Sequence, residues 1–276
     1  MGIITSQQLT KYYDLYRDTE VTFTKEIINT LHLDPRRVYI KCTDGKWPCI
    51  INSTSLSSAK IILGTKEGGA YTALKNSKDK NTCNLCYCFV PPDSQPVMFF
   101  VSARVTNIEQ YMNSTELAII TLSFTQRPPD DLIENVGKLL EANINALKRR
   151  EERIVLTDDT KRKLGISHIE TIVQIQGIPR NCILRDMSFS GSKIVLKGLA
   201  AFIKEKDVVL RFEFDDPHEV INVPGKIVAT ENVGERKDIV AASIKYTENA
   251  VPMAYKMHIN TYLTTLRKTM FNDGNK

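Results

Sequence analysis

Residues 182–196 have the sequence CILRDMSFSGSKIVL, and residues 49–63 repeat it as CIINSTSLSSAKIIL. Seven of the fifteen positions are identical at a constant offset of 133, and the apolar exchanges among the others are conservative. An internal repeat of this kind indicates that one structural unit occurs twice in the chain.

A second block repeats at an offset of 122, so that residues 102–106 and 116–125 correspond to residues 224–228 and 238–247. Each copy then continues into a segment with helical spacing of apolar residues. Because two blocks recur in the same order, duplication explains the repeat better than chance does. The change of offset means that the first copy carries about eleven extra residues between the blocks.

Each copy contains short β-branched or alternating runs between Gly, Pro and Asp turns, followed by one helix. This pattern predicts a mainly β protein with a few helices, built as two tandem small antiparallel β-barrels, each closed by a C-terminal helix. The predicted strands are 38–42, 49–51, 60–63, 97–105 and 117–124 in the first copy, and 171–176, 183–184, 193–196, 208–214, 226–229 and 239–246 in the second.

The helix that ends the first copy is predicted over 130–147. Asp130 and Asp131 would lie in its first turn, where acidic side chains are favourable, and its apolar residues recur at helical spacing. The predicted organisation is a degenerate first barrel over 1–128, a connecting helix over 129–147, a second barrel over 148–268 and a tail over 269–276. A helix is also expected over 252–268.

The composition is that of an ordinary globular protein, with 276 residues, 42% hydrophobic and 25% charged. No run of about 18 apolar residues predicts a membrane span, and the first residues do not resemble a secretory signal. We therefore expect a cytoplasmic protein whose six cysteines are reduced thiols. A net charge of +5 is compatible with an anionic ligand or with weak affinity for nucleic acid, and demonstrates neither.

Two short polar motifs carry the functional information. Arg149 and Arg153 are four residues apart after the predicted helix, and Asp186-x-Ser188-x-x-Gly191 follows 33 residues later. In this order, on a repeated barrel, the pair resembles PilZ domains, which are bacterial receptors for cyclic di-GMP. The resemblance covers 147–267, and the whole chain is similar to the two-domain PilZ proteins of spirochaetes.

The resemblance implies six-stranded PilZ-type barrels and a cyclic di-GMP site in which Arg149 and Arg153 wrap the ligand above a floor of Asp186, Ser188 and Gly191. Arginine can fork onto guanine or phosphate and can stack on a base. A carboxylate can accept from guanine N1 and N2, the serine hydroxyl can complete this edge or hold the turn, and glycine permits a left-handed backbone or close ligand approach. A second tier consists of Lys148, Arg150 and Ser190.

The first copy lacks these groups. Ser53 and Ser58 stand at the positions of Asp186 and Gly191, and Glu20 stands opposite Arg153. We therefore expect the first barrel to be a scaffold or a partner-binding unit that does not take the ligand. In the second copy Lys148 precedes the first arginine, which leaves one or two ligands per site open.

Other candidate sites are weaker. Cys83, Cys86 and Cys88 have a spacing that could hold zinc with Cys42 or Cys49 as a fourth ligand, but the same run also fits a strand with small buried side chains. The four histidines are scattered, and no catalytic constellation is found. We expect no metal, no cofactor other than the ligand cyclic di-GMP, and no enzymatic activity.

The expected function is a cyclic di-GMP receptor that changes the arrangement of its domains on binding. By resemblance it would regulate motility, surface behaviour or virulence through a protein partner. The alternative is a cyclic di-GMP-controlled regulator that binds nucleic acid through the basic junction and the barrel surfaces.

Overall fold

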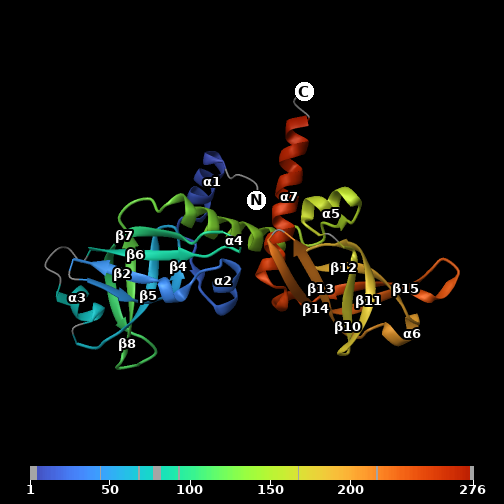
Figure 1. The fold of residues 1–276 in the computed structure, drawn as a ribbon, viewed down its shortest axis with the longest axis horizontal. Helices are drawn as coiled ribbons and strands as arrows, with labels where there is room; N and C mark the ends of the chain where they lie inside the picture. Colours follow the sequence, from blue (N-terminus) through green and yellow to red (C-terminus); the bar gives the residue numbers. More distant parts are fainter. Residues whose placement is uncertain are drawn as a thin grey trace. The chain divides into compact units, whose positions relative to one another are not determined.

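The computed structural model describes residues 5–273 apart from positions 44, 68, 77–81, 93, 167 and 216. The chain forms two compact units, one up to Leu140 and the other from Glu141 onward. The division falls inside one helix, α4 (Asp130–Lys148), which matches the helix predicted over 130–147. Each unit is built mainly from antiparallel strands, which confirms the predicted class (Figure 1).

The first unit contains the following helices and strands: α1 (Ser6–Tyr16), β1 (Val21–Thr22), α2 (Lys25–Thr30), η1 (Pro35–Arg37), β2 (Tyr39–Cys42), β3 (Gly45–Pro48), β4 (Ile50–Thr54), β5 (Ser58–Gly64), α3 (Ala70–Asn76), β6 (Thr82–Phe89), β7 (Val97–Gln110), β8 (Leu117–Phe124) and the first half of α4.

The second unit contains the end of α4, then β9 (Ile154–Val155), α5 (Asp158–Leu164), β10 (Glu170–Ile175), β11 (Ile178–Met187), β12 (Gly191–Lys197), α6 (Ala200–Ile203), β13 (Asp207–Asp215), β14 (His218–Val233), β15 (Arg236–Tyr246), η2 (Glu248–Ala250) and α7 (Met253–Asp273).

The second unit is a closed six-stranded barrel. Its strands pair in the order β10-β13-β14-β15-β12-β11, and β10 also pairs with β11, which completes the ring. The short strand β9 adds to the end of β11. Helix α7 buries Tyr255, Ile259 and Leu263, which are four residues apart on one face, in the core of this barrel. The six strands and the closing helix agree with the prediction.

The first unit differs in strand count, because its sheet has eight strands in the order β1-β4-β5-β8-β7-β6-β2-β3. Strands β3 and β4 correspond to the single strand β11 at the offset of 133, and the break between them falls at Cys49. The preceding residue is Pro48, which has no N–H to donate to a ladder, whereas the second copy has Asn181 there. The first copy therefore departs from the predicted six-stranded barrel in this detail, that one of its strands is split in two.

Helix α4 packs into the first unit with its N-terminal half. Leu132, Ile133 and Val136 are buried, and the helix passes α1 closely at Gly137. A Cβ at Gly137 would lie 2.4 Å from the ring of Tyr12, so only glycine fits there.

The duplication is visible in the irregularities of the two sheets. A bulge on the strand before the turn, and a second bulge between the last two long strands, recur at the offsets of 133 and 122. The bulges fall between Ile51/Ser53 and Leu184/Asp186, and between Val105/Asn107 and Ile227/Ala229. Because bulges are local departures from regular pairing, their recurrence supports a common origin for the two copies.

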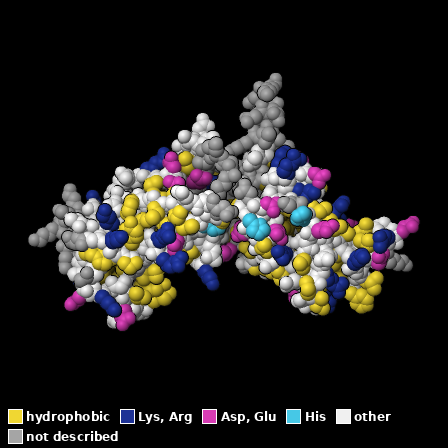
Figure 2. All heavy atoms as spheres, in the orientation of Figure 1, with side chains coloured by type: hydrophobic (Ala, Val, Ile, Leu, Met, Phe, Trp, Pro, Cys, Tyr) yellow, Lys and Arg dark blue, Asp and Glu magenta, His cyan; other side chains and the backbone are white. Residues whose placement is uncertain are grey.

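No helix in the described ranges has both the length and the apolar character needed to cross a membrane. Figure 2 shows lysine and arginine side chains on both units with acidic side chains among them, as expected for a modest net charge of +5.

Candidate functional site

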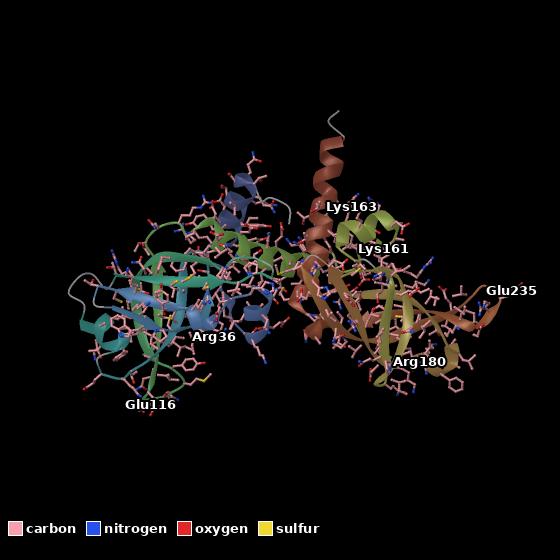
Figure 3. All side chains as sticks on the ribbon, viewed as in Figure 1. Arg36, Glu116, Lys161, Lys163, Arg180 and Glu235 are labelled. Carbon is pink, nitrogen blue, oxygen red and sulfur yellow. The ribbon has the colours of Figure 1, made fainter. Side chains whose placement is uncertain are left out.

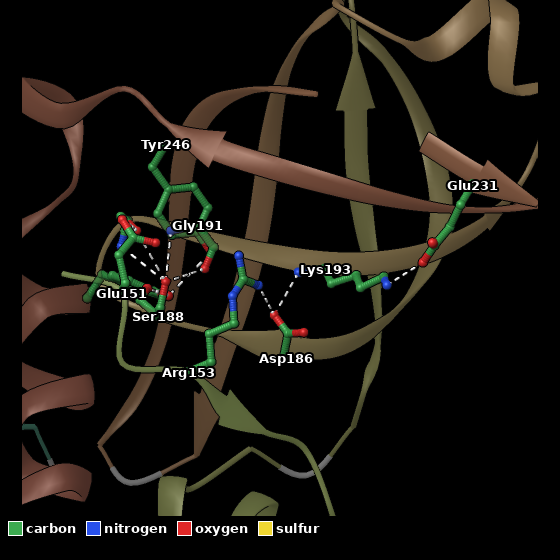
Figure 4. Close-up of polar contacts among 10 residues, drawn as sticks. Glu151, Arg153, Asp186, Ser188, Gly191, Lys193, Glu231 and Tyr246 are labelled. Carbon is green, nitrogen blue, oxygen red and sulfur yellow. Dashed lines mark hydrogen bonds and ion pairs between the residues drawn. The ribbon is translucent and has the colours of Figure 1, made fainter. Parts of the chain in front are cut away.

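The two motifs meet at an ion pair between Arg153 and Asp186. Arg153 directly precedes β9, which pairs with the end of β11, so its Nη1 lies 2.5 Å from Asp186 Oδ1 (Figure 4). The backbone N–H of Lys193, across the strand pair, donates to the same oxygen at 3.1 Å. The Arg153 side chain is 43% exposed and that of Asp186 is 16% exposed, so both remain accessible to a ligand.

The turn after Asp186 is held by Ser188. Its hydroxyl accepts from the backbone N–H groups of Ser190 and Gly191 at 3.3 and 3.1 Å and donates to the Gly191 carbonyl at 3.0 Å. Ser188 is fully buried. Of the two roles that the sequence allowed for this hydroxyl, the structure supports holding the turn.

Gly191 is required by packing against the neighbouring strand. A Cβ there would lie 2.3 Å from the carbonyl oxygen of Ile244 on β15, and the φ of Gly191 is outside the left-handed region. Of the two reasons that the sequence allowed for this glycine, a left-handed backbone or close ligand approach, the first does not apply. The residue allows β12 and β15 to approach closely at the start of β12.

Two buried tyrosines behind the turn were missed by the sequence analysis. The hydroxyl of Tyr255 on α7 donates to the Ser188 carbonyl at 2.8 Å and lies 3.3 Å from the hydroxyl of Tyr246. Burial raises the pKa of both phenols, so they stay neutral donors. Helical spacing can indicate only a core position for Tyr255, because spacing does not reveal which carbonyl a hydroxyl meets.

The remaining basic residues of the first motif differ in their contacts. Arg150 makes two hydrogen bonds to Glu248, at 2.8 and 3.0 Å. Arg149 lies in the turn after α4, where its N–H donates to the Asn145 carbonyl at 2.8 Å. Within the described ranges, the side chains of Lys148 and Arg149 form no hydrogen bond or ion pair. The Arg149 side chain is thus available to contact a ligand, whereas the Arg150 side chain is already bonded to Glu248.

Glu151 and Glu152, which lie between Arg150 and Arg153, fix the loop to the rest of the unit. The hydroxyl of Ser190 donates to Glu151 at 3.0 Å, so Ser190, predicted in the second tier, is engaged inside the protein. Glu152 accepts two hydrogen bonds from Arg267 of α7, at 2.8 and 3.2 Å. Arg267 was not singled out from the sequence, because nothing local relates it to a loop 115 residues earlier.

The first copy keeps the turn and reverses the charge beside it. The Ser55 hydroxyl accepts from the N–H groups of Ser57 and Ser58 at 3.2 and 3.0 Å, as Ser188 does in the second copy. Glu20, at the position of Arg153, accepts from Ser53 and from Lys60, and these hydrogen bonds lower its pKa. A carboxylate therefore stands where the second copy has a guanidinium.

The cysteine motif lies on β6. Alternation along a strand places Cys83 on the opposite face from Cys86 and Cys88, and all three are buried. Within the part of the chain that the structure describes, no group of three or more Cys, His, Asp or Glu side chains could hold a metal ion. Burial raises the pKa of Cys83 to about 12, which favours the interpretation as packed thiols.

Other polar features lie away from the motifs. Lys161 and Lys163 on α5 (Figure 3) are paired with Asp158 and Asp159, each at 2.7 Å. A cavity of about 300 Å³ lies between β10 and β13, and none of the predicted site residues lines it. Neither feature competes with the Arg153–Asp186 pair as a site for an anionic ligand.

Comparisons with known proteins match both units. The PilZN3 domain model matches residues 7–143, and the PilZ domain model matches residues 147–264. A protein of Treponema denticola described as a cyclic di-GMP binding protein is 46% identical over 270 residues, which are 97% of this chain and 85% of that protein.

Two solved structures are similar over most of their length. The PlzA protein of Borreliella burgdorferi in complex with c-di-GMP is 25% identical, with 93% of this chain and 98% of that chain covered and a TM-score of 0.42. YcgR from Escherichia coli in complex with c-di-GMP is 14% identical, with 90% and 91% covered and a TM-score of 0.28.

Proposed function

We propose that this chain, which belongs to the family of PilZ proteins with a PilZN3 domain ahead of the PilZ domain, is a cyclic di-GMP receptor without enzymatic activity. The ligand binds to the PilZ domain, between the turn at 149–153 and the turn at 186–191. The observation that carries the proposal is the Arg153–Asp186 pair, because it joins the two motifs at one accessible point.

The unused hydrogen-bonding groups of the Arg153–Asp186 pair suit guanine. Asp186 uses Oδ1 for Arg153 and for the N–H of Lys193, and within the described residues its Oδ2 accepts no hydrogen bond. Oδ2 can therefore accept from guanine N1 and N2. The exposed guanidinium of Arg153 keeps N–H groups that can fork onto guanine O6 and N7 or onto a phosphate.

Arg149 supplies the second cation. Its guanidinium has no partner in the described part of the protein, so binding a phosphate or stacking on a base would not require an existing ion pair to break. The PilZN3 domain serves as the internal comparison. Its equivalent position carries the Glu20 carboxylate, which repels an anion.

Titration of the full-length protein with cyclic di-GMP tests the proposal, with GMP and cyclic di-AMP as controls. Adenine presents an amino donor where guanine has O6, so cyclic di-AMP would place a donor against Arg153. We expect cyclic di-GMP to bind roughly tenfold or more tightly than cyclic di-AMP. Equal affinity for the two dinucleotides would contradict guanine recognition by this pair.

The output is proposed to be a change in the arrangement of the two units. Arg149 directly follows Lys148, the last residue of α4, and the first half of this helix is buried in the PilZN3 unit. A ligand shifts such an equilibrium only if it contacts the two states differently, and the turn at 149–153 provides such contacts. By this route the receptor would act on a protein partner that regulates motility, surface behaviour or virulence.

Small-angle scattering of the full-length protein measures this output. Saturation with cyclic di-GMP is expected to change the radius of gyration, and the Arg153→Ala variant at the same ligand concentration is expected to scatter as the ligand-free protein. Identical curves for the free and saturated wild type would refute the coupling and leave ligand binding intact.

A further inference from the structure

A pair of lysines lies on the barrel surface next to the ligand turn. On β15, Lys245 is the register partner of Gly191 on one side and of Lys226, on β14, on the other side. Neighbouring strands are about 5 Å apart, so Lys245 lies roughly 10 Å, or two strand spacings, from the strand that carries Asp186. The lysine pair thus adjoins the proposed site.

Both side chains point outward from the barrel. Their strand neighbours Ile227 and Ile244 are buried in the core, and alternation directs Lys226 and Lys245 to the opposite face, where both are exposed. Two like charges at directly opposite positions of an antiparallel pair are destabilising. Such a pair is unfavourable unless an anion lies near both ammonium groups.

The protein supplies no such anion in the described ranges, where neither ammonium forms an ion pair or hydrogen bond. Nearby lysines behave differently, because Lys193 is paired with Glu231 on β14. The lysines of α5 are paired as well. Among the described lysines, Lys226 and Lys245 are register partners that both lack an acidic partner, in contrast to Lys193, which shares the same barrel surface.

The PilZN3 unit provides an internal comparison. At the offset of 122 the positions of Lys226 and Lys245 are Arg104 and Ser123, which are also register partners. The second cation is thus absent from the copy that has Glu20 in place of Arg153. The paired cations occur in the copy that carries the complete motif.

We infer that Lys226 and Lys245 form an anion subsite of the proposed ligand site, which takes a phosphodiester group of cyclic di-GMP. The inference rests on the proposed function and deepens it. The phosphate could belong to the molecule held by Arg153 and Asp186 or to a second molecule beside it. Either source supplies the same chemistry, a singly charged phosphodiester between two ammonium groups.

Calorimetric titration of the full-length Lys226→Gln/Lys245→Ser double variant with cyclic di-GMP tests the inference. The affinity is expected to fall roughly tenfold or more, or the stoichiometry to fall from two ligands to one. Weaker affinity at unchanged stoichiometry assigns the phosphate to the first molecule, and a loss of one equivalent assigns it to a second. Added salt should weaken binding less in the variant than in the wild type, because fewer charged contacts are screened.

Lys197→Ser is the matched control, since it removes one exposed lysine from β12 at the end of the strand away from Gly191. It is expected to bind as the wild type does. Wild-type affinity and stoichiometry in the double variant would overturn the subsite while leaving the receptor function standing. If the wild-type protein itself fails to bind cyclic di-GMP, the proposed function falls and the subsite falls with it.

Discussion

Arg153→Ala is expected to weaken cyclic di-GMP binding by roughly 100-fold or more. The substitution removes the exposed guanidinium that would contact the ligand, and it leaves Asp186 without the cation that orients it. A charge-assisted hydrogen bond contributes about 1.5–3 kcal/mol, and tenfold in affinity corresponds to about 1.4 kcal/mol, so the loss of two such contacts accounts for this factor. Titration calorimetry of the full-length variant measures it.

Comparing Arg149→Ala with Arg150→Ala distinguishes a direct contact with the ligand from a general effect of positive charge, because each variant removes one charge from the same loop. Arg149 has no side-chain partner in the described part of the chain, so its removal should weaken binding strongly without changing the free energy of unfolding. Arg150 is engaged with Glu248, and its removal should change affinity by less than about threefold. An equal loss for both variants would show that the loop acts through its total charge and not through the proposed contacts.

Gly191→Ala is expected to destabilise the PilZ unit by about 1–3 kcal/mol, the usual cost of forcing an extra group into a packed site. The new Cβ would lie 2.3 Å from the Ile244 carbonyl oxygen, and a backbone carbonyl in a sheet cannot move aside as a flexible side chain can. Chemical denaturation followed by circular dichroism measures the loss.

Gly198→Ala is the matched control, because the nearest atom to its Cβ would be Arg180 Nη1 at 3.7 Å, an ordinary contact. It should change the unfolding free energy by no more than about 0.5 kcal/mol. The single tryptophan of the chain, Trp47, lies in the PilZN3 unit. Its fluorescence therefore reports on that unit and not on the PilZ unit, which carries both glycines. If the two glycine variants prove equally stable, the close approach at Gly191 is not what selects glycine.

The parts of the fold that follow from sequence are those with a repeating signal. The internal repeat predicted two related barrels, and the apolar spacing after Asp130 predicted α4 almost to its last residue. The split of one strand at Cys49 was not predicted, because an apolar pattern does not show where ladder pairing is interrupted. The two-residue strand β9, which positions Arg153, is too short to leave any pattern.

The site divides in a similar way. The sequence placed Arg153 and Asp186 together through a motif, and the structure brings them into contact. The support of the turn from behind and the need for glycine at 191 depended on partners that the sequence does not reveal, a buried Tyr255 hydroxyl at the Ser188 carbonyl and the carbonyl of Ile244. Such partners come from strands and helices more than fifty residues away, so only the register of the folded sheet identifies them.

In the turn shared by the two copies, the groups that hold the loop in shape differ from the groups that would select a ligand. Serine hydroxyls and backbone amides hold the loop in both units, through Ser55 in one and Ser188 in the other. The groups that would choose a ligand lie beside this framework, on Glu20 or Arg153. Substitutions at those flanking positions can therefore change what the loop recognises while its hydrogen bonds stay intact. The ligand preference of this turn can thus evolve without a change in the fold of the barrel.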